Sequence, residues 1–375
     1  MTRDKRSKKD VAGVLPIIRG LLAKPSGSED DPYTRVILRP ARDNQGQPVF
    51  PLPPFAVGDV SGSSEEIRER LRGLLDRYRT NYGGSPVVVS LPGEVVYQVE
   101  SEALTDQQPL RNKVALVTGA AGAIGAGICQ GLLVKGCRVA ATDFHQGNLD
   151  SLIKELKPIA EERIAGILLD VTDQDSVTRG FEEVARIWGG IDIVVVNAGI
   201  AMVSDLMEMD LEAFRKIERV NVEGTLLTLA EAGRWMRRQG TGGDIILIST
   251  KNVFCPGAQF GAYSATKAAS HQLARIASLE YAPFGVRVNM VAPDAVFSGG
   301  GRRSGLWQEV GPSRMQARGL DEKGLEEYYR NRNLLKVRVT AEHVAHAVLF
   351  FATRQTPTTG VTIPVDGGLP DSTPR

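Results

Sequence analysis

The sequence has few of the residues that build disulfide frameworks and metal sites. It contains three cysteines and four histidines among 375 residues, and the cysteines lack the paired spacing of a zinc site. Cys129 and Cys137 lie in or near apolar stretches, which favours buried free thiols. His343 and His346 are three residues apart in a helical pattern, and we interpret them as part of a solvated helix face rather than as a metal pair. No bound metal is expected.

Long apolar runs are also lacking. No segment approaches the ~18 consecutive apolar residues that a membrane-spanning helix needs. The basic first ten residues are not followed by the apolar stretch and cleavage site of a signal peptide. The net charge is only +1, so there is no overall basic field that would attract nucleic acid. We expect a cytoplasmic protein that binds a small molecule, and neither a membrane nor nucleic acid.

Residues 1–110 differ in pattern from the rest of the chain. Many of the prolines lie there, and we take them to exclude long regular elements. Ser63 to Glu66 form a helix-start pattern that precedes apolar residues at helical spacing. Residues 35–38 and 86–89 have the composition of strands. The segment has no histidine and no glycine-rich phosphate loop. We expect a small, non-catalytic α/β appendage that docks on the main domain or on a partner subunit.

Residues 111–375 have the pattern of a larger second domain. Short apolar runs alternate with amphipathic helical patterns, and the runs cover residues 114–117, 138–141, 164–169, 193–196, 245–248 and 286–291. Such alternation predicts a parallel sheet with helices on both faces. We therefore predict a Rossmann-type, doubly wound α/β fold, whose ligand crevice lies outside the carboxyl ends of the strands.

A glycine-rich segment follows the first of these runs. Its candidate cofactor contacts are Gly119, Ala121, Gly122, Ala123, Ile124 and Gly125. Glycine between a strand and a helix lets the backbone approach a pyrophosphate at the positive end of the helix. The same glycines would also allow the helix to pack closely on the strand, so the loop alone does not decide between the two interpretations.

The ends of the next three runs support cofactor binding. Asp143 follows the glycines by about 20 residues, where a carboxylate accepts hydrogen bonds from the ribose hydroxyls and repels a 2′-phosphate. Phe144 beside it brings no compensating positive charge, which favours NAD over NADP. The later strand ends carry Asp170, Val171, Asn197, Ala198 and Gly199. Asp170 alone would equally indicate helix capping, but four consecutive strand ends now carry loops compatible with a ligand.

Tyr263 and Lys267 lie four residues apart at the start of a helical pattern after the fifth run. Residues at this spacing share a helix face, so the phenol and the ammonium would point into the same space. A phenol has a pKa of about 10, and a neighbouring cation brings it towards neutral pH. We interpret the two residues as an acid–base pair, although the same spacing is usually structural elsewhere.

Together these motifs resemble the short-chain dehydrogenases/reductases over about residues 112–368. The resemblance implies that Tyr263 is the general acid/base, and that Lys267 lowers its pKa and holds the nicotinamide ribose. It assigns Asn221 to a proton relay through a bound water, whereas the alternative is a side chain that caps a kinked helix. The resemblance also adds cofactor contacts at Val220, Pro293, Asp294 and Val296.

Several positions depart from the family's pattern. Ala123 replaces a usual glycine, with Gly122 one place earlier. The family's substrate-orienting serine corresponds to Thr250, whose hydroxyl donates and accepts as serine does but whose methyl group crowds the pocket. Ser249 is the fallback for that role. Asp294 replaces another glycine and places a carboxylate beside the nicotinamide region.

A narrower resemblance is to the dehydrogenase half of the fused rhamnulose-1-phosphate aldolase/lactaldehyde dehydrogenases. It rests on residues 249–252, 293–297 and 326–336. Residues 14–97 are similar to the segment that links the two halves, and the aldolase half has no counterpart in this sequence. The narrower resemblance implies a short 2-hydroxyaldehyde or a sugar-derived substrate.

We therefore expect an NAD-dependent oxidoreductase that transfers hydride between nicotinamide and a small hydroxylated compound, such as a lactaldehyde-like 2-hydroxyaldehyde, a sugar or a polyol. One alternative is a reductase of larger ketones of the acyl or polyketide type, and another is a cofactor-binding protein without turnover. The family commonly forms dimers and tetramers, so we expect a homo-oligomer. We expect residues 297–335 to form a flexible loop over the substrate, with a hinge at Gly299 to Gly301.

Overall fold

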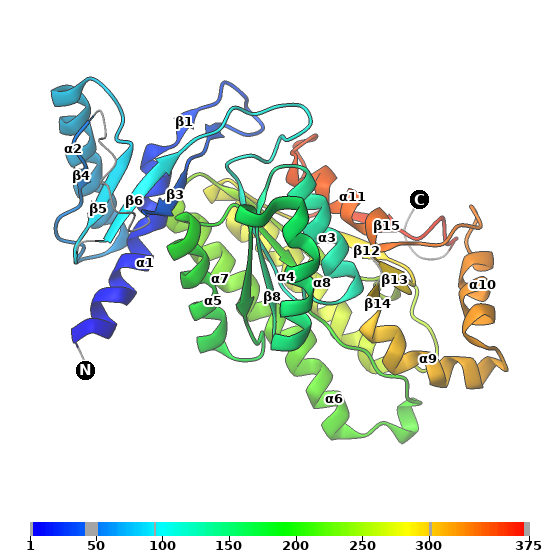
Figure 1. Cartoon of the computed structure of the whole chain (residues 1–375). Coiled ribbons are helices and arrows are strands. Elements are labelled where there is room, and N and C mark those ends of the chain that lie inside the picture. Colours follow the sequence, from blue (N-terminus) through cyan, green and yellow to red (C-terminus); the bar gives the residue numbers. More distant parts are fainter. Residues whose placement is uncertain (1–2, 42–51, 94, 300–301, 371–375) are drawn as a thin grey trace.

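The structure is a computed structural model that describes residues 3–41, 52–93, 95–299 and 302–370 (Figure 1). Within these ranges, no helix combines the length and the apolar character that a membrane crossing requires. The first hundred residues form the elements α1 Arg3–Leu22, β1 Lys24–Pro25, β2 Tyr33–Thr34, β3 Ile37–Pro40, β4 Phe55–Ala56, α2 Ser64–Tyr82, β5 Val88–Leu91 and β6 Val95–Glu100.

The remaining residues build the larger domain. Its first half forms β7 Val114–Val117, α3 Ala123–Val134, β8 Arg138–Asp143, α4 Gln146–Ala160, η1 Glu161–Arg163, β9 Ile164–Leu168, α5 Gln174–Trp188, β10 Ile193–Val196, η2 Leu206–Glu208, α6 Leu211–Glu218, η3 Arg219–Glu223 and α7 Gly224–Gln239. Its second half forms β11 Gly243–Ile248, η4 Lys251–Val253, α8 Gly261–Tyr281, η5 Ala282–Phe284, β12 Val286–Pro293, β13 Ser298–Gly299, β14 Arg302–Arg303, α9 Gly305–Arg318, α10 Glu322–Arg332, α11 Ala341–Ala352 and β15 Thr362–Val365.

Seven parallel strands form the central sheet, in the order β15-β12-β11-β10-β7-β8-β9. The strand order reverses direction between β7 and β10, which places the ligand crevice of a doubly wound sheet beside β7. Six of the seven strands lie where the apolar runs predicted them. The seventh, β15, is an edge strand with mostly half-buried residues, and its weak apolar pattern gave no strand prediction.

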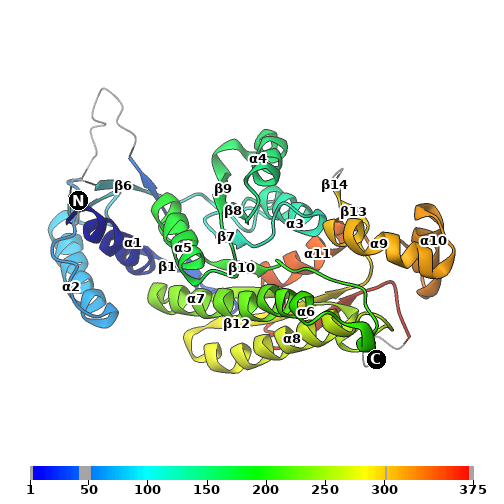
Figure 2. The same cartoon turned by 90° about the horizontal axis from the view of Figure 1, so that it is seen from below.

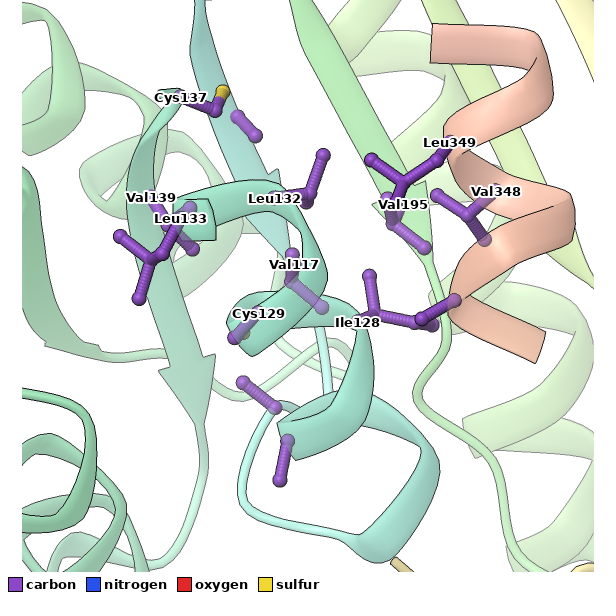
Figure 3. Close-up of a cluster of buried hydrophobic side chains, with 14 of the residues drawn as sticks. Val117, Ile128, Cys129, Leu132, Leu133, Cys137, Val139, Val195, Val348 and Leu349 are labelled. Atoms are coloured by element: carbon purple, nitrogen blue, oxygen red, sulfur yellow. The ribbon is translucent and has the colours of Figure 1, made fainter. Parts of the chain in front are cut away.

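Helices cover both faces of the sheet, as the sequence predicted (Figure 2). Residues of α3, α4 and α11 fill the core on one face, and residues of α5, α7 and α8 fill it on the other. Figure 3 shows the first of these cores, where Leu132 of α3 and Val348 of α11 lie on either side of Val195 of the sheet. Because these apolar layers cover both faces of the sheet, almost every residue of its inner strands is buried, and these strands are continuous apolar runs.

The first hundred residues form a small sheet of their own, in the order β3-β6-β5-β4, with α1 and α2 beside it. Ser63 caps α2 and Glu66 completes a capping box, while Gly83 ends the helix in the left-handed region at φ +69°. The expectation that prolines exclude long elements here is wrong, because α1 spans 20 residues with Pro16 inside it. Leu15 and Ile17 on either side of Pro16 are buried, and this packing offsets the backbone hydrogen bond that proline cannot donate.

Helix α1 packs against α5 and α7 of the larger domain, and buried charges join the two parts. Asp192, 1% exposed, accepts hydrogen bonds at 3.0 and 2.7 Å from the guanidinium of Arg19, which is equally buried. Arg35 lies 3.0 Å from the same carboxylate. A second contact links Asp31 to Lys113 at 2.6 Å. That residues 1–110 act only in docking stays a prediction.

Candidate active site

A cavity of about 1640 Å³ opens outside the carboxyl ends of the strands, at the switch between β7 and β10. It exceeds the ~300–1,000 Å³ of pockets that hold a single small ligand, so a dinucleotide and a second molecule fit together. Every catalytic and cofactor residue named from the sequence lines this cavity, except Asn221, which lies directly behind it. The described residues contain no group of three or more His, Cys, Asp or Glu side chains that could hold a metal ion.

The glycine loop between β7 and α3 forms one wall of the cavity. Gly119 has φ +59°, and a Cβ there would lie 2.9 Å from Cα of Ala198. A Cβ on Gly125 would lie 2.4 Å from the carbonyl oxygen of Gly119. Gly122 is the N-cap of α3 and has no side chain to cap the helix. Ala123 fits as the first helical residue. The loop therefore exposes backbone N–H groups at the positive end of a helix, the arrangement that binds a phosphate.

Asp143, the last residue of β8, is hydrogen-bonded to the glycine loop. Its Oδ2 accepts a hydrogen bond at 3.2 Å from the backbone N–H of Ala121, and its Oδ1 accepts one at 3.1 Å from the N–H of His145. The carboxylate is 8% exposed and lines the cavity, whereas the ring of Phe144 is 73% exposed. A carboxylate held in this way at the end of β8 is placed to accept hydroxyl donors.

A cation that the local sequence did not reveal lies beside the same loop. Arg302 is 3.5 Å from the carbonyl oxygen of Ala121, donates to Ser151 at 3.1 Å and pairs with Glu155 at 2.9 Å. It comes from β14, more than 150 residues after the glycines, so no pattern near the loop signals it. Because Glu155 neutralises it, Asp143 remains the dominant charge at this end of the cavity.

The strand ends after β9 and β10 take two different roles. Asp170 accepts hydrogen bonds from the backbone N–H and the hydroxyl of Thr172 at 2.9 and 2.8 Å and closes a local turn, whereas the helix cap of α5 is Asp173. Asn197 donates to the carbonyl oxygens of Thr118 and Gly119, both at 2.9 Å, and so fixes the glycine loop. Val171 is buried beneath the cavity floor.

Asn221 lies in the π-helical turn η3, a local widening that often marks functional sites. Its Nδ2 donates to the carbonyl oxygen of Ile200 at 2.9 Å and to the hydroxyl of Thr266 at 3.0 Å, and its Oδ1 accepts from the N–H of Ile200 at 2.9 Å. The side chain therefore ties α8 to the loop after β10. A Cβ on Gly199 would lie 3.2 Å from Oδ1 of Asn221 and 3.1 Å from Nζ of Lys267, so this glycine keeps the two side chains close.

Tyr263 and Lys267 point into the cavity from the first turns of α8. The hydroxyl of Thr250 is hydrogen-bonded to the phenol of Tyr263, and Nζ of Lys267 donates to the carbonyl oxygen of Ile248 at 3.0 Å. All three side chains are more than nine-tenths buried. Three groups able to hold or move protons thus converge where β11 ends.

That Lys267 lowers the pKa of Tyr263 stays a prediction. Burial raises the pKa of Tyr263 to about 12, and the hydrogen bond from Thr250 opposes this rise. Burial also lowers the pKa of Lys267 to about 8. At neutral pH the phenol is therefore protonated and can donate a proton.

Ser249 and Thr250 face in different directions. The hydroxyl of Ser249 lies 2.9 Å from Nδ1 of His271, and Nε2 of that imidazole lies 3.3 Å from the hydroxyl of Thr362. Ser249 is therefore engaged in a buried chain of polar groups away from Tyr263. This geometry favours Thr250 in the substrate-orienting position.

Residues after β12 form a helical cover, so the expectation of a flexible loop over residues 297–335 is wrong. Helices α9 and α10 occupy most of this segment. Trp307 stacks on Phe297 at 4.4 Å between ring centroids and meets Tyr329 edge-on at 4.9 Å. This aromatic cluster is what orders the cover, and its members are too far apart in sequence to form a helical stripe. Of the expected hinge, Gly300 and Gly301 lie outside the described residues.

The cover is joined to the strand end by Asp294. Its carboxylate pairs with Arg332 of α10, including a contact of 3.3 Å between Oδ2 and Nε. Pro293 ends β12 and is buried, and Val296 is buried and bridges to Val339. The carboxylate that replaces the family's glycine therefore has a partner in the cover.

A protein-family model described as short chain dehydrogenase matches residues 113–308. The chain belongs to this family. Its members bind a nicotinamide cofactor, which agrees with the loop, the carboxylate and the strand-end residues assembled around the cavity.

Among similar short-chain dehydrogenases is the uncharacterized oxidoreductase YuxG of Bacillus subtilis, 37% identical over 69% of this chain. The chain spans only 37% of that relative's length. The L-xylulose reductase of Homo sapiens is 30% identical over 69% of this chain and 97% of its own length. The solved structure of sorbitol-6-phosphate 2-dehydrogenase from Erwinia amylovora has a TM-score of 0.63 and 28% identity, covering 68% of this chain and 98% of that one.

Proposed function

We propose that the protein is an NAD-dependent oxidoreductase that moves hydride between nicotinamide and the carbonyl or carbinol carbon of a small hydroxylated compound. The observation that carries the proposal is the convergence of Tyr263, Thr250 and Lys267 in the cavity that also contains the glycine loop. The names of relatives that act on sorbitol, xylulose and butanediol support a sugar or polyol substrate. A lactaldehyde-like 2-hydroxyaldehyde is the narrower form of the same proposal.

The residues present fit the cofactor. Gly119 and Gly125 have no room for a Cβ, because a side chain there would meet Ala198 or the backbone of the loop itself, and this close packing holds the loop at the N-terminus of α3, where backbone N–H groups can bind a pyrophosphate. Asp143 would accept hydrogen bonds from the adenosine ribose, and Lys267 from its buried position would hold the other ribose. When bound, the nicotinamide supplies or accepts the hydride.

In this mechanism Tyr263 donates a proton to the substrate oxygen during reduction and accepts it during oxidation. Thr250, already hydrogen-bonded to the phenol, orients the same oxygen. Lys267 and Asn221 form the route by which the phenol exchanges its proton with solvent, and Asn221 holds the loop that lines this route. If the substrate is an aldehyde that is oxidised, the hydride is transferred from the hydrate of that aldehyde.

The proposal is tested by measuring NAD and NADP reduction with a panel of polyols, aldoses and lactaldehyde. Turnover of small hydroxylated compounds supports it. Turnover only of larger ketones, with the reduced cofactor, would assign the protein to acyl or polyketide reduction. Cofactor binding without turnover of any compound would indicate a regulatory protein.

Cofactor preference depends on Asp143. We expect the protein to bind NAD more tightly than NADP, because a buried carboxylate repels a 2′-phosphate. Asp143→Ala combined with Phe144→Arg should shift the preference towards NADP, measured as the ratio of the two dissociation constants by calorimetry. Arg302→Gln is the matched control for the nearby cation and should leave that ratio in favour of NAD. Tighter NADP binding by the unmodified protein would contradict the role of Asp143.

The substrate-orienting role is assigned to Thr250. Thr250→Val keeps the side-chain shape and removes the hydroxyl, so kcat should fall by about 10²-fold, as for the loss of one oriented donor. Ser249→Ala removes a hydroxyl that is bound to His271, and kcat should change little. Steady-state kinetics on one substrate compares the two variants, and the reverse ranking would assign the role to Ser249.

We also propose a cytoplasmic homo-oligomer, a dimer or a tetramer. Apolar side chains on the outer faces of α7 and α8 support it, since Leu226, Ile276 and Leu279 are 49%, 43% and 71% exposed. Pairing of these helices between subunits would remove the side chains from water.

A further inference from the structure

The substrate end of the cavity gathers positive charge. Four cationic side chains line it, and we call them the basic cluster: Lys251 of η4, Arg314 and Arg318 of α9, and Arg332 of α10. Arg332 is paired with Asp294. The other three have no carboxylate within ion-pair distance among the residues that the structure describes, although Glu309 lines the same cavity from an exposed position on α9. The cluster therefore carries more positive charge than its surroundings neutralise.

Arg314 is the most unusual member. It is 6% exposed, and its Nη1 reaches only the carbonyl oxygen of Ala258 and Oε1 of Gln259, both at 3.4 Å. Its buried Nε has no acceptor in the part of the chain that is described. Charged groups are almost never fully buried unless they are paired. A guanidinium that is buried, without an anion and directed into a cavity is a binding group for an anion.

The members of the cluster are close enough to influence one another. Burial lowers the pKa of Lys251, the charges of Arg332 and Arg314 lower it further, and the charges of Asp294 and Cys255 oppose them. A hydrogen bond from Arg318 lowers the pKa of the Tyr328 phenol, and the charges of Arg332 and Arg314 act in the same direction. The lowered pKa of Tyr328 agrees with an excess of positive charge at this end of the cavity.

Packing of the cover is a purely structural explanation of these arginines. Each one lies over an aromatic ring: Arg314 over Phe260, Arg318 over Tyr328 and Arg332 over Tyr329, at 4.6, 4.7 and 4.1 Å. Stacking uses only the flat face of a guanidinium, however, and leaves its N–H groups free in the plane. A neutral side chain would pack the cover equally well without the cost of burying a charge.

The cluster lies next to the reacting groups. Arg314 stacks on Phe260, and the ring of Phe260 is 6.1 Å from the ring of Tyr263 between centroids. An anion bound to Arg314 would therefore lie a few bonds from the carbon that exchanges hydride. The same side chain that fixes the anion would fix the distance of that carbon from the phenol.

We propose that the substrate carries an anionic group, a phosphate monoester or a carboxylate, bound by Arg314 with help from Arg318 and Lys251. This inference rests on the proposed function and specifies its substrate class. Planar guanidinium groups bind both anions through two parallel hydrogen bonds. Hydride transfer is unchanged, and the anionic group takes no part in bond making or breaking.

The experiment compares kcat/KM for D-sorbitol, D-sorbitol 6-phosphate and D-gluconate with NAD. One of the two anionic compounds should exceed the neutral polyol by about 10- to 100-fold, the range that charge-assisted hydrogen bonds provide. Preference for the phosphate or for the carboxylate identifies which anion the site takes. Equal values, or a preference for the neutral polyol, overturn the inference.

Two variants assign the preference to the cluster. Arg314→Gln should remove most of the preference, with a larger fall in kcat/KM for the anionic compound than for the neutral one. Arg338→Gln makes the same charge change on an exposed residue that pairs with Glu326 outside the cavity, and should keep the preference. If Arg314→Gln does not fold, Arg314→Lys, which keeps the charge but loses the fork, should give an intermediate preference. An equal loss in the Arg338 variant contradicts the assignment.

A binding measurement keeps this test independent of turnover. Inorganic phosphate and acetate are titrated into NAD-saturated Tyr263→Phe protein, with and without Arg314→Gln, by calorimetry. Binding of either anion that Arg314→Gln weakens at least about 10-fold supports the inference, and the absence of binding overturns it. If no compound in the panel is oxidised or reduced while anion binding persists, the proposed function fails and the anion site stands.

Discussion

Replacing Tyr263 with phenylalanine should lower kcat by about 10³-fold and leave the dissociation constant for NAD almost unchanged. The substitution removes one hydroxyl, the group hydrogen-bonded to Thr250, and keeps a ring of the same size in a site that is more than nine-tenths buried. Stopped-flow or steady-state kinetics measures the first effect, and calorimetric titration with NAD measures the second.

Two further variants make this result specific. Tyr281→Phe removes a hydroxyl from the same helix, one that donates to the carbonyl oxygen of Leu229 at 3.3 Å outside the cavity, and should keep kcat. Lys267→Met should reduce both kcat and NAD affinity, because Lys267 lies beside Tyr263 and beside the expected ribose. Retention of most activity by Tyr263→Phe would falsify the proposed mechanism.

Replacing Asp192 with asparagine should lower the free energy of unfolding by about 3–5 kcal/mol. The change keeps the shape of the side chain, leaves Arg19 buried without an anion and leaves Arg35 with Asp31 as its remaining carboxylate. The backbone N–H of Val114 also loses a charged acceptor at 2.8 Å. Urea-induced unfolding, followed by circular dichroism, measures the difference.

Asp76→Asn is the surface control for this substitution. Asp76 pairs with Arg79 at 3.6 Å, and both side chains are exposed, so the loss should be below about 1 kcal/mol. Burial opposes the ionisation of Asp192, but Arg19 and Arg35 outweigh it and lower its pKa. The stabilisation by Asp192 is therefore present above the ordinary carboxyl pKa and is lost as the pH falls through the lowered value. Similar losses for Asp192→Asn and Asp76→Asn would mean that the buried pairs contribute little.

The parts of the fold that the sequence predicted are those encoded by neighbouring residues. The runs that became β7 and β10 are apolar because both faces of each strand are covered, and a continuous run is visible without any knowledge of contacts. The glycine loop and the spacing of Tyr263 and Lys267 are also local, since each lies within one turn or one helix.

The parts that could not be predicted depend on contacts between distant residues. Arg302 reaches the glycine loop from β14, and Arg314 reaches the cavity through a cover held by aromatic side chains. The different orientations of Ser249 and Thr250 depend on His271, which lies 22 residues after Ser249 on α8. The raised pKa of Tyr263 follows from its burial. The spacing of Tyr263 and Lys267 in the sequence gives no information about burial.

The buried pair of Arg19 and Asp192 also constrains how this protein can change over time. The two residues lie 173 positions apart and belong to parts of the chain that differ in pattern, and replacing Asp192 alone leaves Arg19 buried without an anion. A chain that acquires or loses the first hundred residues must therefore alter Asp192 in the same step or soon after. Although the two parts are separable in sequence, Asp192, directly before β10, makes the stability of the dehydrogenase domain depend on the segment that precedes it.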